Sequence, residues 1–227
     1  TFTINTERKV TSKYFSFSTN DDEYNVLKKI RTTDNTAFLL GNADFALGIV
    51  TGNNKEYISD EKTPDNEMVL KGADISKYHI NPATNYIIFK PESFQQIAPT
   101  EMYRAKEKLL YRFISSQLVF AYDNKQTLSL NSCNIVIPRI PGTKMKYVLA
   151  ILNSRIAQFI YKREFNSVKI LRSHIENIPI PLVDEITQNR IITLTDKLID
   201  GLEINEAEKV YEELDTLIAK VFNLNSS

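Results

Sequence analysis

The chain has 227 residues, of which 42% are hydrophobic and 25% charged, and its formal net charge at pH 7 is zero. A chain of this size can bury a core large enough for one domain, or for a domain with a helical appendage. It has no apolar run of membrane-spanning length, and its first residues do not read as a signal peptide. Its single cysteine, Cys133, excludes an intramolecular disulfide. We therefore expect a cytoplasmic protein without a membrane partner. Because the sequence begins with Thr1 rather than Met, we expect a longer parent polypeptide.

The first hundred residues predict short strands separated by polar loops. A strand is expected near residues 14–17, followed by a helix that Asn20 caps and that carries an acidic first turn. Further strands are expected at 45–50, 68–70 and 85–89, with a loop at 53–66 that contains Pro64. This part of the chain therefore indicates a sheet.

The remainder predicts both strands and long helices. A charged helix is expected at 101–113, then strands at 118–122, 127–130 and 133–138, the first two joined by a tight hairpin at 123–126. A long helix should follow at 145–165, and two amphipathic helices at 184–201 and 204–222 should form a helical hairpin. The prediction is an α+β fold with a twisted, mainly antiparallel or mixed sheet and packed helices. We divide it into a domain at 1–182 and the hairpin at 183–227.

The zero net charge conceals a strong segregation of charge along the chain. Residues 101–174 hold 13 Lys and Arg against 4 Asp and Glu, whereas residues 175–227 hold 4 against 11. A basic middle beside an acidic tail is typical of a surface that binds a polyanion, attached to a solvated helical end. Clustering that serves only solubility would give the same pattern, so both interpretations stay open.

Four short motifs occur in a fixed order. They are GIVTGN at residues 48–53, LKGADI at 70–75, LAILNS at 149–154 and IPIP at 178–181. Together they resemble the TaqI-like C-terminal specificity domain, the target-recognition domain of adenine-modifying restriction–modification enzymes, which is related to type I specificity subunits. The resemblance covers about residues 20–182, and the tail is too short for the long spacer helices of type I subunits.

The resemblance implies sequence-specific recognition of double-stranded DNA. It also implies a methyltransferase domain in the same parent chain, with S-adenosylmethionine as its cofactor and with nuclease activity in some relatives. We expect no cofactor, metal ion or catalytic residue in this segment. Its sequence lacks a Pro-Pro dipeptide, so the motif that holds the target amine in adenine methyltransferases is absent, and no phosphate-binding glycine loop or zinc-protease motif occurs.

Candidate DNA-binding residues are polar or basic side chains in expected loops, where a rigid sheet can present them to a ligand. They are Asn53, Asn54, Lys55, Lys71, Lys77, Lys125, Gln126, Arg139, Lys144 and Lys146. We expect the basic members to form a continuous face with the acidic tail turned away. Asp74 is expected to stabilise its own turn, and residues 149–154 and 178–181 to be structural. The alternative interpretations are plain turns and solvated surfaces, and the alternative function is a protein–protein interaction module.

Overall fold

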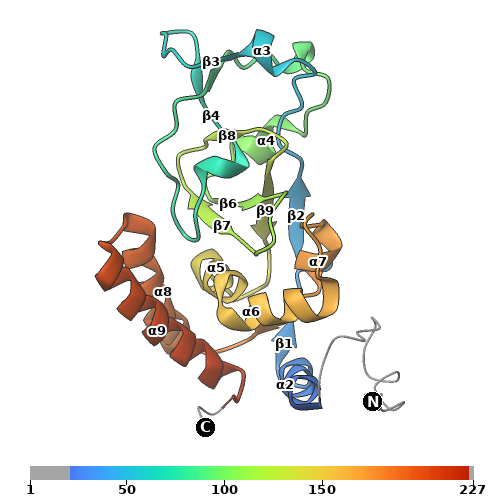
Figure 1. Ribbon diagram of the computed structural model, residues 1–227, viewed down its shortest axis with the longest axis vertical. Helices are drawn as coiled ribbons and strands as arrows, with labels where there is room; N and C mark the ends of the chain where they lie inside the picture. Colours follow the sequence, from blue (N-terminus) through green and yellow to red (C-terminus); the bar gives the residue numbers. More distant parts are fainter. Residues whose placement is uncertain (1–20, 225–227) are drawn as a thin grey trace.

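The computed structural model describes residues 21–224 and is elongated, with a helical layer at one end and two sheets above it (Figure 1). The strands are β1 (Thr36–Ala37), β2 (Ala43–Ala46), β3 (Ile58–Ser59), β4 (Glu67–Leu70), β5 (Tyr86–Ile87), β6 (Lys108–Arg112), β7 (Phe120–Asp123), β8 (Leu128–Ser129), β9 (Cys133–Pro138) and β10 (Ile180–Pro181). The helices are α2 (Asp21–Arg31), α3 (Asn54–Tyr57), α4 (Thr100–Tyr103), α5 (Met145–Asn153), α6 (Arg155–Ile160), α7 (Arg172–Glu176), α8 (Glu185–Asp200) and α9 (Ile204–Val221). The strand predicted near residues 14–17 and the cap predicted at Asn20 lie outside the described residues.

The central sheet has four antiparallel strands in the order β2-β9-β6-β7. Successive residues of β6 point to opposite faces, so Leu109 and Tyr111 join one apolar core while Leu110 joins another. The first core lies between the sheet and the helical layer, and the second lies between the sheet and a smaller sheet above it. The sheet is therefore buried on both faces, which explains its nearly continuous apolar strands.

The smaller sheet has the order β3-β5-β4-β8 and includes one parallel pair, β4 with β8. The predicted hairpin at residues 123–126 is therefore wrong, because β8 leaves the central sheet and pairs with β4 instead of β7. The predicted loop at 53–66 is also wrong in part, since it contains α3 and β3. The α+β class with mixed sheets is confirmed.

The predicted helix at 101–113 is wrong beyond its first turn. Helix α4 ends at Tyr103, and Lys108–Arg112 forms β6, which pairs with both β7 and β9. Leu109 and Leu110 fit a helical stripe as well as an alternating strand, so local periodicity alone misassigned them. Pairing on both edges and burial on both faces stabilise the strand.

The predicted helix at 145–165 is divided at Ser154. Ser154 has an extended backbone, with a ψ of 160°, and therefore ends α5. Its Oγ accepts a hydrogen bond from the Ala157 amide at 3.1 Å, so the same residue caps α6. A π-helical turn, Tyr161–Phe165, follows α6.

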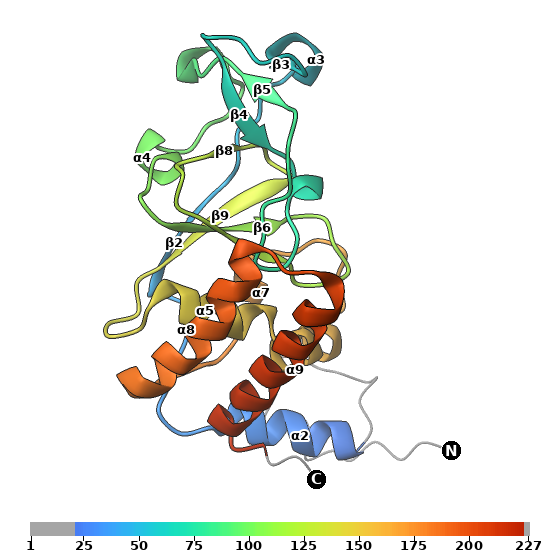
Figure 2. The ribbon, with the colours of Figure 1, turned by 90° about the vertical axis from the view of Figure 1, so that its left-hand side faces the viewer.

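The predicted helical hairpin is confirmed. Helices α8 and α9 lie side by side, and α8 packs on α5 (Figure 2). Leu194, Leu214 and Ile218 of the hairpin are buried in the same apolar core as α5 and the central sheet. The hairpin is thus part of the main core, while the boundary between residues 182 and 183 stays a prediction.

Candidate nucleic-acid interface

Three loops leave the central sheet at the same end. The register pairs Lys108 with Asp123, Leu109 with Val136, and Ala43 with Pro138, so the start of β6 adjoins the ends of β7 and β9. Residues 104–107, 124–127 and 139–144 therefore emerge together, and we call these three segments the loop end of the central sheet. The loop end carries Arg104, Lys106, Lys125, Gln126, Arg139 and Lys144.

The tip of the 124–127 segment is a small turn built around the Asp123 side chain. Asp123 Oδ1 accepts hydrogen bonds from the Lys125 amide (3.0 Å) and Thr127 Oγ1 (2.9 Å), and Oδ2 accepts one from the Thr127 amide (2.9 Å). Gln126 has a φ of 57°, in the left-handed region. Lys125 and Gln126 are exposed while Asp123 and Thr127 are buried. The turn therefore presents exposed polar side chains, Lys125 and Gln126 among them, on a buried anchor.

A buried ion pair lies beneath this turn. Lys108 and Asp123 both have 0% side-chain exposure, and Lys108 Nζ lies 2.5 Å from Asp123 Oδ2. The same ammonium group donates a hydrogen bond to the Tyr103 carbonyl at 2.7 Å. Burial lowers the pKa of Lys108, and the Asp123 carboxylate opposes this change. Each charge is thus desolvated and has a defined partner.

Arg104 fixes the turn from the other side. Its guanidinium donates to the Gln126 carbonyl at 3.1 Å and to both carboxylate oxygens of Glu67, at 2.6 and 2.7 Å. The same group lies over the Phe89 ring, 5.0 Å from its centroid. Because a bidentate contact fixes a guanidinium in orientation, Arg104 ties the turn to β4 of the smaller sheet.

Lys144 of the loop end and Lys146 at the start of α5 contact the acidic hairpin. Lys144 pairs with Glu185 at 2.9 Å, and Lys146 pairs with Asp196 at 2.6 Å. The contact with Lys144 lowers the pKa of Glu185. The prediction that the acidic tail is turned away is therefore wrong. The reason is that the apolar stripe of α8 packs on α5, which brings the acidic flank of α8 against the residues at the start of α5.

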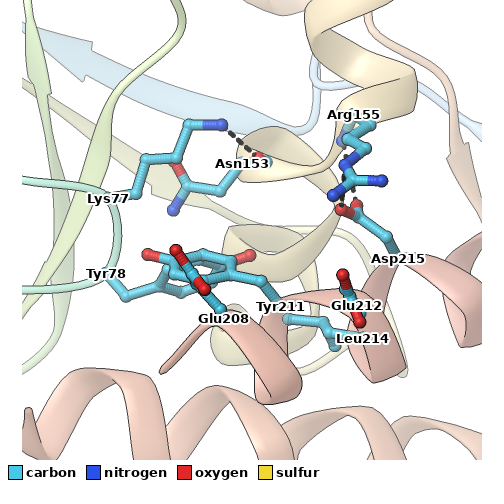
Figure 3. A pocket seen from close by; sticks show the side chains of 9 residues that line it. All are labelled: Lys77, Tyr78, Asn153, Arg155, Glu208, Tyr211, Glu212, Leu214 and Asp215. Atoms are coloured by element: carbon cyan, nitrogen blue, oxygen red, sulfur yellow. Dashed lines mark hydrogen bonds and ion pairs between the residues drawn. The ribbon is translucent and has the colours of Figure 1, made fainter. Parts of the chain in front are cut away.

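Lys77 also faces the hairpin. It lines a cavity of about 490 Å³ between the sheet domain and α9, together with Arg155 and three carboxylates (Figure 3). Its Nζ donates to the Asn153 carbonyl at 2.8 Å, while Arg155 pairs with Asp215 at 3.0 Å. Burial lowers the pKa of Lys77, and Asp215 opposes this change. Lys77 therefore lies apart from the loop end.

The remaining candidates occupy two other places. Lys71 Nζ donates to Asn85 Oδ1 at 2.5 Å, and the Lys71 amide donates to Asp74 Oδ2 at 2.7 Å, which confirms the predicted role of Asp74 in its turn. The neighbouring Gly72 packs closely against the backbone of Ser132, since an added Cβ would lie 2.5 Å from the Ser132 carbonyl oxygen.

The second of these places is the tip of the smaller sheet. Asn53, Asn54 and Lys55 are exposed at the start of α3, far from the helical layer (Figure 1). Asn54 accepts a hydrogen bond from Thr51 Oγ1 at 2.6 Å. The loop end and the adjoining start of α5 thus carry Lys125, Gln126, Arg139, Lys144 and Lys146, whereas the other five candidates lie elsewhere.

Sequence reasoning missed the supporting residues of the loop end. Lys106 and Lys108 were assigned to a helix, and Asp123 to a hairpin turn. One signal was available: no Asp or Glu occurs between Asp123 and Glu164, although seven Lys and Arg do.

The two histidines fall outside any polar cluster, since His79 Nδ1 contacts the Ile199 carbonyl and His174 stacks on Phe165. Within residues 21–224, no group of three or more His, Cys, Asp or Glu could hold a metal ion.

The sequence matches the TaqI-like C-terminal specificity domain over residues 67–180. The chain belongs to this family. The matched stretch runs from the start of β4 into β10 and includes all three segments of the loop end. The chain is accordingly a specificity domain of restriction–modification systems, the part that recognises a DNA target. No curated protein matches the sequence.

Three solved structures of longer proteins match parts of this chain. The type IIL restriction–modification enzyme MmeI, in complex with DNA, is 10% identical with a TM-score of 0.56, over 81% of this chain and 33% of that chain. The HsdS subunit from Thermoanaerobacter tengcongensis is 17% identical with a TM-score of 0.46, over 82% and 44%. The type IIG restriction endonuclease BpuSI is 11% identical with a TM-score of 0.49, over 92% and 34%. This specificity domain thus spans less than half of each of these proteins. None of its helices within residues 21–224 has the length and apolar character needed to cross a membrane.

Proposed function

We propose that this specificity domain reads a short sequence in double-stranded DNA through the loop end of its central sheet. One observation carries the proposal: the family match includes an exposed Lys125–Gln126 turn that is held on both sides by buried or bidentate contacts. Rigid support matters because a side chain discriminates between bases only when its donors and acceptors are held in register with a base edge.

The loop end offers two kinds of contact with a duplex. Lys106 and Lys125 are exposed cations suited to phosphate oxygens, which position a protein without reading sequence. The Gln126 side-chain amide carries both a donor and an acceptor, the combination that pairs with the N6 and N7 atoms of adenine in the major groove. Arg139 and Lys144 are exposed at the same end and are held by Asp44 and Glu185.

The parent enzyme is proposed to be an adenine-specific DNA methyltransferase, with or without endonuclease activity. Its methyltransferase domain, in the same cytoplasmic chain, would bind S-adenosylmethionine and receive the flipped adenine. The role of the specificity domain would be to select the site and hold the duplex. We propose that the cofactor binds to the methyltransferase domain and not to the specificity domain, as the family resemblance implies.

The proposal is tested by fluorescence anisotropy with the 227-residue chain and a library of duplexes selected for binding. Affinity should decrease with salt, and Lys106→Ala or Lys125→Ala should each reduce the slope of log K against log salt by about 0.9. Lys209→Ala, which removes an exposed lysine of α9, is the matched control and should leave the slope unchanged. An affinity that is constant between about 50 and 200 mM salt would overturn the proposal.

Base reading is tested separately with Gln126→Asn. Asn tolerates the left-handed backbone at this position but shortens the amide by one methylene group. We expect it to relax the preference at one base pair by about 1–3 kcal/mol, with an unchanged salt slope. Gln117→Asn, on an exposed residue before the opposite end of β7, is the control. Equal effects of the two changes would exclude Gln126 as a base-reading residue.

A protein-interaction module remains the second candidate function, and the hairpin favours it. Ile186 and Ile204 are 82% and 77% exposed, and the solvent side of α9 is acidic. Under this alternative, DNA affinity would be absent or insensitive to salt, and Ile186→Asp would release a partner protein. Cross-linking of the full parent protein, followed by mass spectrometry of the peptides joined to α8 or α9, measures that release.

A further inference from the structure

The buried pair of Lys108 and Asp123 requires an explanation beyond stability. Both side chains are fully excluded from solvent, beside the apolar residues Leu109 and Leu110 of β6. Because desolvation of two charges offsets much of their attraction, apolar residues of similar volume would hold the sheet equally well. The role of the pair must therefore be inferred from the other groups that it contacts.

The Asp123 carboxylate joins β6 to the turn. Of the four hydrogen bonds that it accepts, three come from residues 125–127 and one comes from Lys108. Lys108 is itself fixed by the carbonyl of Tyr103, at the end of α4. The conformation of the turn is thus coupled to the central sheet through the Asp123 carboxylate, as it is coupled to the smaller sheet through Arg104.

We propose that Lys108 and Asp123 are positioning residues for DNA sequence recognition, and that they set the base preference at the position read by the Lys125–Gln126 turn. The inference rests on the proposed function. Asp123 orients the turn directly, and Lys108 holds the carboxylate in the rotamer that does so. Neither side chain reaches the surface, so neither would contact DNA.

The chemistry of the carboxylate makes this role specific. Each of its oxygens accepts two hydrogen bonds, and all four donors lie inside the protein or in the turn itself. An amide at this position would have one oxygen and a donor NH₂ group, so at least one pair of donors would lose its acceptor. Asp123→Asn is therefore nearly isosteric and should release the turn from its fixed geometry without opening a cavity.

The test compares Asp123→Asn with the wild-type chain, using duplexes from a library with a randomised central stretch that wild-type protein has enriched. We expect the preference at one or two adjacent base pairs to decrease about tenfold or more, whereas binding to the unselected library and its salt slope stay unchanged. A purely structural role would weaken binding to all duplexes alike. Thr127→Val removes one of the same hydrogen bonds and should give a smaller change at the same base pairs.

The matched control is Glu164→Gln, which breaks another largely buried ion pair, with Arg31, in the helical layer. It should lower the free energy of unfolding but leave the sequence preference unchanged. If Asp123→Asn does not fold, Thr127→Val and Lys108→Met are measured instead. Lys108→Met keeps the three hydrogen bonds between Asp123 and the turn but removes the cation. The sequence preference of this variant should therefore shift at the same base pairs.

The outcomes separate the two proposals. If the wild-type chain shows no salt-dependent DNA binding or enriches no sequence, the proposed function fails, and the inference fails with it. If the wild type selects a sequence, but folded Asp123→Asn or its substitute variants keep that preference within about twofold, only the positioning role is overturned.

Discussion

Replacing Ile218 by Ala should destabilise the whole specificity domain, although the residue lies in the C-terminal helix. Ile218 is 0% exposed and belongs to the core that joins α9 to α5 and the central sheet. Truncation of a fully buried isoleucine to alanine costs about 2–5 kcal/mol, from lost burial and from the cavity left behind. For a chain of this length, that loss corresponds to a decrease in Tm of roughly 5–15 °C.

The same helix provides a matched control. Ile204→Ala is the same chemical change in α9, but this side chain is 77% exposed. The free energy of unfolding should change by no more than about 0.5 kcal/mol, because surface substitutions have small effects and alanine favours helix. The difference between the two variants therefore isolates the burial of the hairpin.

Urea and thermal unfolding, followed by far-ultraviolet circular dichroism, measure both variants. Because the hairpin shares its core with the sheet domain, we expect a single transition that Ile218→Ala shifts as a whole. Equal stabilities of the two variants would refute the reasoning. A separate early transition that only Ile218→Ala affects would show that residues 183–227 unfold by themselves, in support of the predicted domain boundary.

Three further changes test other parts of the fold. Gly48→Ala should destabilise the protein by about 3 kcal/mol or more, because the added Cβ would lie 2.1 Å from the Leu130 carbonyl oxygen; a normal Tm would contradict this. Ser154→Ala should cost about 1 kcal/mol in urea unfolding by removing the cap of α6, and Ser154→Asp should retain most of it. Burial lowers the pKa of His174, so the unfolded state takes up a proton first as the pH falls through about 6.5, and stability should decrease until the lower folded-state pKa is reached. The His174→Gln variant should lack that decrease. If the free energies of unfolding of the wild type and the variant change in parallel with pH, His174 is not the source of the pH dependence.

The parts of the fold that follow from local sequence were predicted well. Helices α8 and α9 have sustained amphipathic patterns and clear boundaries at Asp184 and Gly201, so neighbouring residues suffice to define them. Strand β9 likewise matches its predicted bounds, Cys133–Pro138. Family motifs added what periodicity could not, since the match runs from β4 into β10.

The errors occurred where distant residues decide the structure. Strand β6 has an ambiguous pattern and is a strand because β7 and β9 flank it. Strand β8 pairs with β4, some sixty residues earlier, so its neighbours along the chain gave no indication of its partner. The acidic side chains of α8 were expected to face solvent, yet apolar docking of the same helix directs Glu185 and Asp196 toward lysines.

The candidate site shows the same division. Exposed loop residues such as Lys125 and Gln126 were identified from their polarity and position, and the structure places both at the loop end. Their support was missed because Lys108 and Asp123 are fifteen residues apart and are charged, properties that suggest a surface. Only the pairing of β6 with β7 brings the two charges together inside the protein.

The short pair of β1 with β10 has a consequence for exchanging specificities. It joins Thr36 to Pro181 and Ala37 to Ile180, so the segment between them, which holds both larger sheets and helices α5 to α7, begins and ends at neighbouring points. Partner Cα atoms in such a pair lie about 5 Å apart, whatever the loops between them do. A segment bounded by these strands could therefore be transplanted between relatives through one narrow joint, provided that the α5 surface beneath the hairpin is matched. Loops inside the segment could then change in length and sequence without moving α2 or the α8–α9 hairpin that flank it.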